Sequence, residues 1–141
     1  MNELAWQNPE GASLPERLSQ DFDCQVLYLR YNTGRAIHDN GADLAQRLEQ
    51  LINEYPVPVE SLTLVGHSMG GLVGQAYLAR HANVSASPDV GAFVTLATPW
   101  GGHAAAQEGL DRSPVVLPVW RDLAPSSDFL DGLFDGQPSN A

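Results

Sequence analysis

Hydrophobic residues follow two different patterns along this chain. Between positions 44 and 55 they recur every three or four residues, which predicts an amphipathic helix that ends before Pro56. The residues of this stripe are Leu44, Leu48, Leu51, Ile52 and Tyr55. Elsewhere, short and nearly continuous apolar runs predict strands at 26–31, 62–65 and 92–97 that are buried on both faces.

Polar and turn-forming residues mark the remaining helices. Ser13 is suited to cap a short helix over 13–19, with Pro15 at an early helical position. Apolar residues predict a helix from 72 to about 80, and a short helix is expected around 129–134. Strands that alternate with helices in this way are typical of crossover units. We therefore predict an α/β fold, with a parallel sheet and helices on both faces, in a single domain over 1–141.

The composition is that of a folded, acidic protein. Seven Lys and Arg residues stand against 17 Asp and Glu residues in 141, a net charge of −10. Such a surface repels phosphate backbones, which argues against nucleic acid as a partner. No apolar stretch reaches the ~20 residues of a transmembrane segment, and the N-terminus does not resemble a signal peptide. As written, the sequence predicts a cytoplasmic protein.

Cysteine and histidine give no sign of a metal or cofactor site. The one cysteine, Cys24, borders an apolar run and is expected to be a buried structural thiol. The four histidines are scattered without the spacing of metal ligands, and the glycines at 66–71 lack the lysine of a phosphate-binding loop. We expect neither a metal nor a cofactor.

The segment Gly66-His67-Ser68-Met69-Gly70 carries the chemistry. It fits Gly-x-Ser-x-Gly and lies between a predicted strand and a predicted helix. In a nucleophile elbow this tight turn strains the serine backbone and lifts the hydroxyl above the ends of the strands, while the glycines avoid collisions. Ser68 is then the nucleophile and the Met69 N–H one oxyanion donor, beside the positive end of the helix. The alternative is a glycine-rich turn with a capping serine.

At these residues the chain resembles the lipases and esterases of the α/β-hydrolase superfamily. Leu64–Leu72 is similar to their elbow, and Thr95–Gly102 is similar to the strand and loop that follow it in the branch of GPI inositol-deacylase-like bacterial lipases. Tyr31–Gly34 and Asp122–Leu130 also resemble segments of bacterial members. Trp100 stands where such proteins usually have His, and we interpret it as part of a pocket wall. The resemblance implies a partial α/β-hydrolase fold.

The histidine that would activate Ser68 is not evident. In this family the order along the chain is Ser, then Asp or Glu, then His. His81 falls about 13 residues after Ser68, hence ~20 Å away along a helix. His38 and His67 are interpreted as loop or surface residues, which leaves His103 as a weak candidate. The resemblance places the acid and the histidine beyond Ala141 and the second oxyanion donor before Met1, so we expect an internal fragment of such an enzyme.

The late carboxylates are interpreted mostly as solvated surface groups. They are Asp111, Asp122, Asp128, Asp131 and Asp135.

The leading hypothesis is a serine hydrolase that cleaves carboxylic esters, including lipids, through an acyl-enzyme on Ser68. Leu72 and Trp100 are expected to offer the cleft apolar surface for an acyl chain. Because the rest of the triad is missing, we expect this isolated chain to be inactive. Two alternatives stay open: an acyltransferase that uses the same elbow, and a non-catalytic module that self-associates through an exposed sheet edge.

Overall fold

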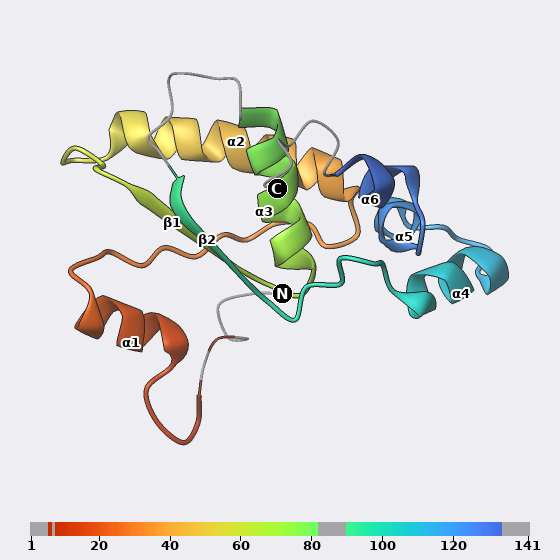
Figure 1. Cartoon of the computed structure of the whole chain (residues 1–141), viewed down its shortest axis with the longest axis horizontal. Helices are drawn as coiled ribbons and strands as arrows, with labels where there is room; N and C mark the ends of the chain where they lie inside the picture. The colour runs from red at the N-terminus through yellow and green to blue at the C-terminus, as the bar shows by residue number, and fades with distance from the viewer. Residues whose placement is uncertain (1–5, 7, 82–89, 134–141) are drawn as a thin grey trace, which may run out of the picture. The chain divides into compact units, whose positions relative to one another are not determined.

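The computed structural model describes residues 6, 8–81 and 90–133, and its chain divides into two compact units, Met1–Thr33 and Gly34–Ala141. Figure 1 shows the order of the elements along the chain. Each unit is described separately below. The prediction of a single domain over 1–141 stays a prediction.

The N-terminal unit contains one helix, α1 (Leu14–Asp21), within its described residues. Ser13 caps it: the Ser13 Oγ accepts a hydrogen bond from the Glu16 N–H, and the Glu16 carboxylate accepts one from the Ser13 N–H at 2.7 Å. This reciprocal pair is a capping box, which satisfies two backbone donors that the helix itself leaves unpaired. The predicted cap and the early Pro15 are confirmed.

Two predictions for the N-terminal unit are wrong. No strand forms over 26–31, and residues 24–32 belong to no regular element. A strand requires hydrogen bonds to a neighbour, and apolar residues alone do not supply them. Cys24 is exposed rather than buried, and its thiol contacts the Leu18 carbonyl oxygen at 3.6 Å.

The second unit holds the sheet and the remaining described helices. Its elements are α2 (Ile37–Glu54), β1 (Leu62–His67), α3 (Met69–His81), β2 (Val90–Leu96), α4 (Ala104–Arg112), α5 (Pro118–Leu123) and α6 (Asp128–Gly132). The predicted strands at 62–65 and 92–97 and the predicted helices at 44–55, 72–80 and 129–134 are confirmed with shifted ends. Helices α4 and α5 were not predicted, because both are short and lie in a Pro-containing stretch of mixed polarity without a clear helical period.

Strands β1 and β2 are parallel and form a two-stranded sheet. Leu64 pairs with Phe93, Gly66 with Thr95, and His67 with Leu96. Parallel strands require a crossover connection, and α3 supplies it. The α/β class and the parallel pairing are therefore confirmed.

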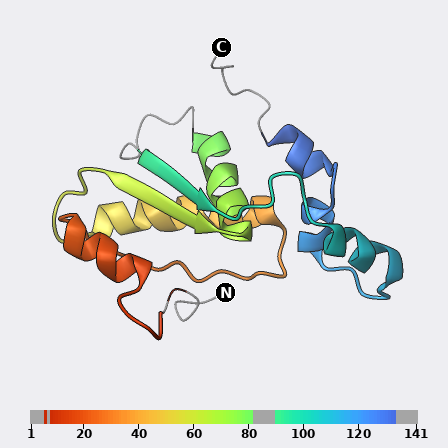
Figure 2. The ribbon, with the colours of Figure 1, turned by 60° about the horizontal axis from the view of Figure 1, so that its bottom comes forward.

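Helix α3 covers one face of this sheet. The side of α3 that faces away from the sheet packs across α2 (Figures 1 and 2). The approach to α2 is close because Gly41 has no side chain: a Cβ there would lie 2.7 Å from the Ala76 Cβ. Tyr77 is buried at the same interface, and burial raises the pKa of its hydroxyl. The largest fully buried side chains belong to these two helices, namely Tyr77, Ile37, Leu72, Val73 and Asn40.

Residues alternate between the two faces of the sheet. Phe93 lies under α3, since a Cβ at Gly74 would meet its ring at 2.6 Å. Val94 and Leu96, which alternate with Phe93 and Thr95 along β2, lie on the other face with Val65, the partner of Val94. Val94 and Leu96 are exposed.

Helices α4, α5 and α6 group together beyond the carboxyl ends of the two strands (Figure 2). The Trp120 ring of α5 packs against α4 at Gly109, where a Cβ would come within 2.9 Å of it. The buried Asp122 connects this group to α2, because its Oδ2 accepts a hydrogen bond from the Ile37 N–H at 2.6 Å. A carboxylate there stabilises the positive end of α2.

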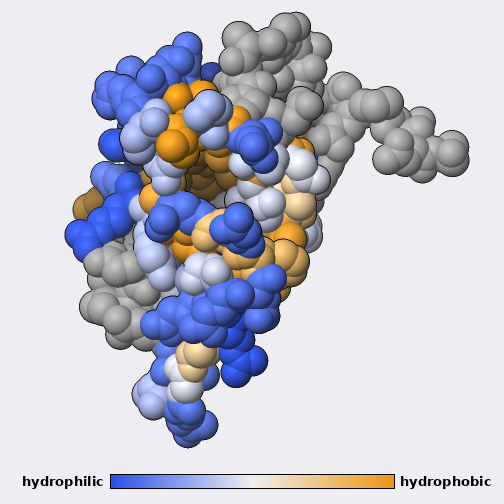
Figure 3. Space-filling model, turned by 90° about the vertical axis from the view of Figure 1, so that its left-hand side faces the viewer, coloured by the Kyte–Doolittle hydropathy of each residue, from blue (hydrophilic) through white to orange (hydrophobic). Residues whose placement is uncertain are grey.

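Hydrophilic side chains cover much of the face seen in Figure 3, with hydrophobic side chains gathered in patches between them. This agrees with the acidic composition. Among the described residues, no helix is both long and apolar enough to cross a membrane.

Candidate active site

Ser68 occupies the turn between β1 and α3. Its φ angle is 53°, in the left-handed region that residues with a side chain rarely adopt. Its N–H donates to the Leu96 carbonyl oxygen at 2.8 Å, which ties the turn to the carboxyl end of β2. Its carbonyl oxygen accepts from the Gly71 N–H at 3.0 Å, which closes the first turn of α3. The strained backbone expected for a nucleophile elbow is therefore present.

Glycine is required at two positions around Ser68. A Cβ at Gly66 would lie 2.6 Å from the Gly71 nitrogen, so β1 meets the backbone of α3 at that point. A Cβ at Gly71 would lie 2.0 Å from the Thr98 Oγ1, so α3 also meets the segment after β2. Because the first of these contacts is with backbone, no side-chain rotation relieves it. Gly66 therefore has the role expected of a glycine in this motif: it lets the strand and the helix approach each other closely.

Met69 is the first residue of α3. The first four N–H groups of a helix have no acceptor within it, and the helix dipole places positive charge at that end. The Met69 N–H is therefore placed among groups that can bind an oxyanion. Its role as oxyanion donor stays a prediction.

The segment after β2 forms a second strained turn beside the first. Ala97 has a φ of 50°, and the Thr98 Oγ1 is buried without a hydrogen-bond partner among the described residues. The sequence does not reveal this strain, because Ala is an ordinary residue at the end of a strand. Trp100 is exposed, and its place in a pocket wall stays a prediction, but Leu72 is 0% exposed and packs in the core. The expectation that Leu72 lines the cleft is therefore wrong.

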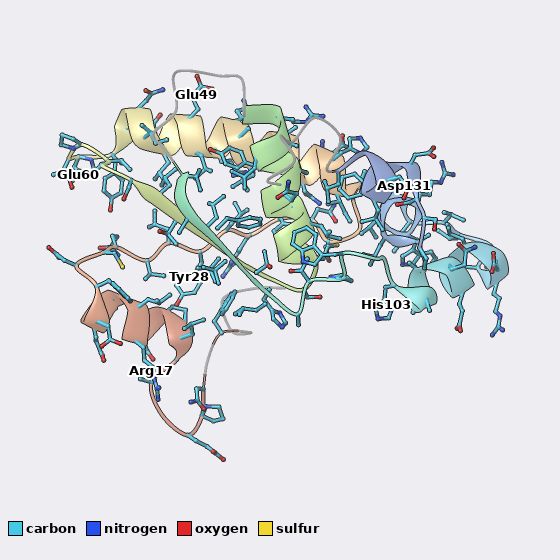
Figure 4. All side chains as sticks on the ribbon, in the orientation of Figure 1. Arg17, Tyr28, Glu49, Glu60, His103 and Asp131 are labelled. Carbon is cyan, nitrogen blue, oxygen red and sulfur yellow. The ribbon has the colours of Figure 1, made fainter. Side chains whose placement is uncertain are left out.

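The described contacts of His38 and His103 are with groups other than Ser68. The His103 Nδ1 accepts a hydrogen bond from the Ala105 N–H at 3.2 Å, so His103 caps α4, where Figure 4 shows its side chain. The His38 ring lies 3.1 Å from Asp39 and 3.4 Å from Asp122. His67 pairs with Leu96 on the sheet face opposite α3, and His81 ends α3. A triad base is not identified in the described part of the chain.

The late carboxylates fall into two groups. Asp122 is buried between α2 and α5, and its backbone carbonyl also accepts from the Ser127 Oγ at 2.6 Å. Asp122 is therefore not the solvated surface group expected for most of these carboxylates. It is buried and hydrogen-bonded to the Ile37 N–H, which lies 85 positions away in the sequence. Asp111, Asp128 and Asp131 are exposed, as predicted, and Figure 4 shows Asp131 on α6. Asp135 lies outside the described residues.

A cavity of about 380 Å³ opens between α4, α5 and α6. Arg121, Ser126 and Phe129 are among its lining residues, and none of the lining residues belongs to the elbow. The cavity is therefore separate from the turn at Ser68, and we assign it no part in the chemistry. Among the described residues, no group of His, Cys, Asp and Glu is arranged to hold a metal ion.

Known proteins resemble part of this chain in sequence. The chain is 34% identical over 97 residues to the lysosomal phospholipase A and acyltransferase of Mus musculus, and 33% identical over 97 residues to those of Canis lupus familiaris and Homo sapiens. Each match covers 63% of this chain but 23% of the relative, so the chain matches about a quarter of the length of these relatives. No solved structure matches. The model of the alpha/beta hydrolase family matches residues 1–140, and the chain therefore belongs to that family.

Proposed function

We propose that this chain carries the nucleophile of a serine hydrolase that acts on carboxylic esters of lipids. The observation that carries the proposal is the Ser68 φ of 53° in a Gly-x-Ser-x-Gly turn between β1 and α3. A strained serine at this turn is rare unless the surrounding structure fixes it, and such strain gathers at functional sites. The relatives named as phospholipases support a lipid ester as the substrate.

The chemistry would run through an acyl-enzyme. The Ser68 Oγ attacks the ester carbonyl carbon, and the negative charge that develops on the carbonyl oxygen is stabilised by the Met69 N–H at the positive end of α3. The bond to the alcohol breaks, and the alcohol leaves with the proton that Ser68 gives up. Water then cleaves the acyl–Ser68 ester, releases the carboxylic acid and restores the hydroxyl.

Little or no turnover is expected from the 141-residue chain by itself. The described partners of His38 and His103 are other than Ser68, so these histidines are not placed to take its proton. Covalent labelling in an alkaline buffer is therefore a better test than turnover, because one slow attack per chain suffices and hydroxide can take the proton that no described histidine is placed to accept. The chain would be incubated with a fluorophosphonate, digested, and analysed by mass spectrometry.

We expect one adduct per chain, on the peptide that contains Ser68, and no adduct in Ser68→Ala. Ser126 offers a matched control, because it is a serine of similar backbone conformation (φ 56°) outside the elbow. Ser126→Ala should label like the parent chain. Absence of labelling in the parent, or equal labelling of Ser68→Ala, would contradict the proposal.

Acyl transfer is a second candidate, because the relatives are also named acyltransferases. The same acyl-enzyme would pass its acyl group to an alcohol in place of water. Adding a short alcohol to an ester hydrolysis assay separates the two: transfer yields a new ester in proportion to the alcohol, whereas hydrolysis yields only the free acid.

A further inference from the structure

The connection between α4 and α5 exposes a short apolar run to solvent. Val115 is 67% exposed, Val116 37% and Leu117 39%. Single exposed apolar residues are common at protein surfaces, but three in succession on one loop are a surface that water solvates poorly.

This loop is held in place at both ends. The Ser113 hydroxyl donates to the Val115 carbonyl oxygen at 2.7 Å and accepts from the Val115 N–H at 3.2 Å. Pro118 occupies the first turn of α5 and fixes the backbone there, while the Trp120 ring packs on α4. The three side chains are therefore presented without a large ordering cost on binding.

The charges around the loop cancel, unlike those of the whole chain. Over α4, the loop and α5 (104–123) the exposed charged residues are two acids and two bases, whereas the third acid, Asp122, is buried and the whole chain carries −10. All four are exposed, namely Glu108, Asp111, Arg112 and Arg121. A neutral, apolar loop on an acidic protein suits a surface without net charge, because an anionic surface would repel the rest of the molecule.

The loop also belongs to the part of the molecule that holds Ser68. Helices α4 and α5 follow β2 and lie beyond the carboxyl ends of the strands, where the Ser68 turn is tied to Leu96 (Figure 2). Trp100, which leads from β2 toward α4, is exposed too. Tryptophan favours the boundary between water and a lipid bilayer.

We propose that the loop Val115–Leu117 docks this chain on a zwitterionic phospholipid surface. The apolar side chains enter the boundary between headgroups and acyl chains, and the charges of α4 and α5 remain among the headgroups. Docking would hold the elbow near lipid esters, and only that consequence rests on the proposed function. Binding itself is tested on Ser68→Ala, so its failure and the failure of catalysis are distinguishable.

The test is co-sedimentation of the Ser68→Ala chain with phosphatidylcholine vesicles. Replacing the three residues together (Val115→Ser, Val116→Ser, Leu117→Ser) should lower the partition coefficient about a hundredfold, because most of the inserted apolar area is lost. Val57 is the matched control: it is 59% exposed but lies between α2 and β1, and Val57→Ser should bind like the parent. Circular dichroism would confirm that each variant is folded.

Two further measurements test the proposal: binding to vesicles that contain anionic lipid, and self-association of the chain on a sizing column. At low salt, adding phosphatidylglycerol should weaken binding. The proposal would be overturned by binding that requires anionic lipid, by equal loss in Val57→Ser and the triple variant, or by no vesicle binding. Concentration-dependent association on a sizing column that the triple variant abolishes, without vesicle binding, would make the loop a protein interface and also overturn it.

Discussion

Replacing Ser68 by glycine should stabilise the protein while removing its proposed nucleophile. The reason is the φ of 53° at this position. The left-handed conformation costs a residue with a Cβ about 1–2 kcal/mol, and glycine avoids this cost. Glycine has a larger entropy cost of its own, about 0.5–1 kcal/mol relative to alanine. The difference favours the glycine variant by about 0.5–1 kcal/mol.

The comparison must separate backbone strain from loss of the hydroxyl. Ser68→Ala removes the hydroxyl and keeps the strain, whereas Ser68→Gly removes both, so the alanine-to-glycine step isolates the backbone. Unfolding of a 141-residue chain carries an entropy of roughly 0.3 kcal/mol/K at the usual value per residue, so 0.5–1 kcal/mol corresponds to about 2–3 °C in Tm. Urea unfolding and thermal melts of the two variants measure the step.

Two further positions test the same reasoning. Ala97 also has a left-handed φ, 50°, and Ala97→Gly should stabilise by a similar amount. Ser113 has an ordinary φ of −89°, so glycine there should be about 0.5–1 kcal/mol less stable than alanine. If Ser68→Gly proves less stable than Ser68→Ala, as expected at Ser113, the turn is not strained and the structural basis for the nucleophile is lost.

Three other perturbations have defined outcomes. Gly66→Ala should lower the free energy of unfolding by about 3 kcal/mol, because the new Cβ meets backbone atoms of α3. Gly74→Ala should lower it by only about 1 kcal/mol, because the Phe93 ring can move aside. Equal losses in urea unfolding would contradict this reasoning. Asp122→Ala should lower the free energy of unfolding by about 1–2 kcal/mol, because the Ile37 N–H loses its acceptor. Asp122→Asn should lower it less, because the amide oxygen can still accept that hydrogen bond. An alanine variant as stable as the parent would show that the hydrogen bond is unimportant. The pKa of Glu16 is lowered by the hydrogen bonds from the Ser13 backbone N–H and hydroxyl, so α1 should lose stability as the pH falls below 4.5 and through that lowered pKa. Amide exchange at the helix start measures this, and Glu16→Gln should abolish the pH dependence.

Local patterns predicted the parts of the fold that depend on neighbouring residues. The Ser13 cap of α1 needs only a suitable residue before the helix, and the stripe of α2 needs only regular spacing along one helix. The strand, turn and helix around Ser68 were also predictable, because they follow one another in the sequence. In each case the interacting groups are a few positions apart.

Contacts between distant segments account for what could not be predicted. The apolar run at 26–31 matches the composition of a strand, yet only a partner strand can make it one. Asp122 looked like other surface carboxylates, because nothing near it in sequence reveals the Ile37 N–H that it binds. His103 could be named as a candidate base, but its role as a helix cap depends on where α4 begins.

The elbow itself combines both kinds of information. Its glycines and serine are local, but the hydrogen bond from the Ser68 N–H to the Leu96 carbonyl joins it to β2, whose next residue, Ala97, is strained in the same way. The turn is therefore held by the pairing of β1 with β2 as well as by its own residues. Loosening β2 should relax Ser68 even when the motif is intact, which is why Gly-x-Ser-x-Gly indicates a nucleophile only where a neighbouring strand fixes the turn.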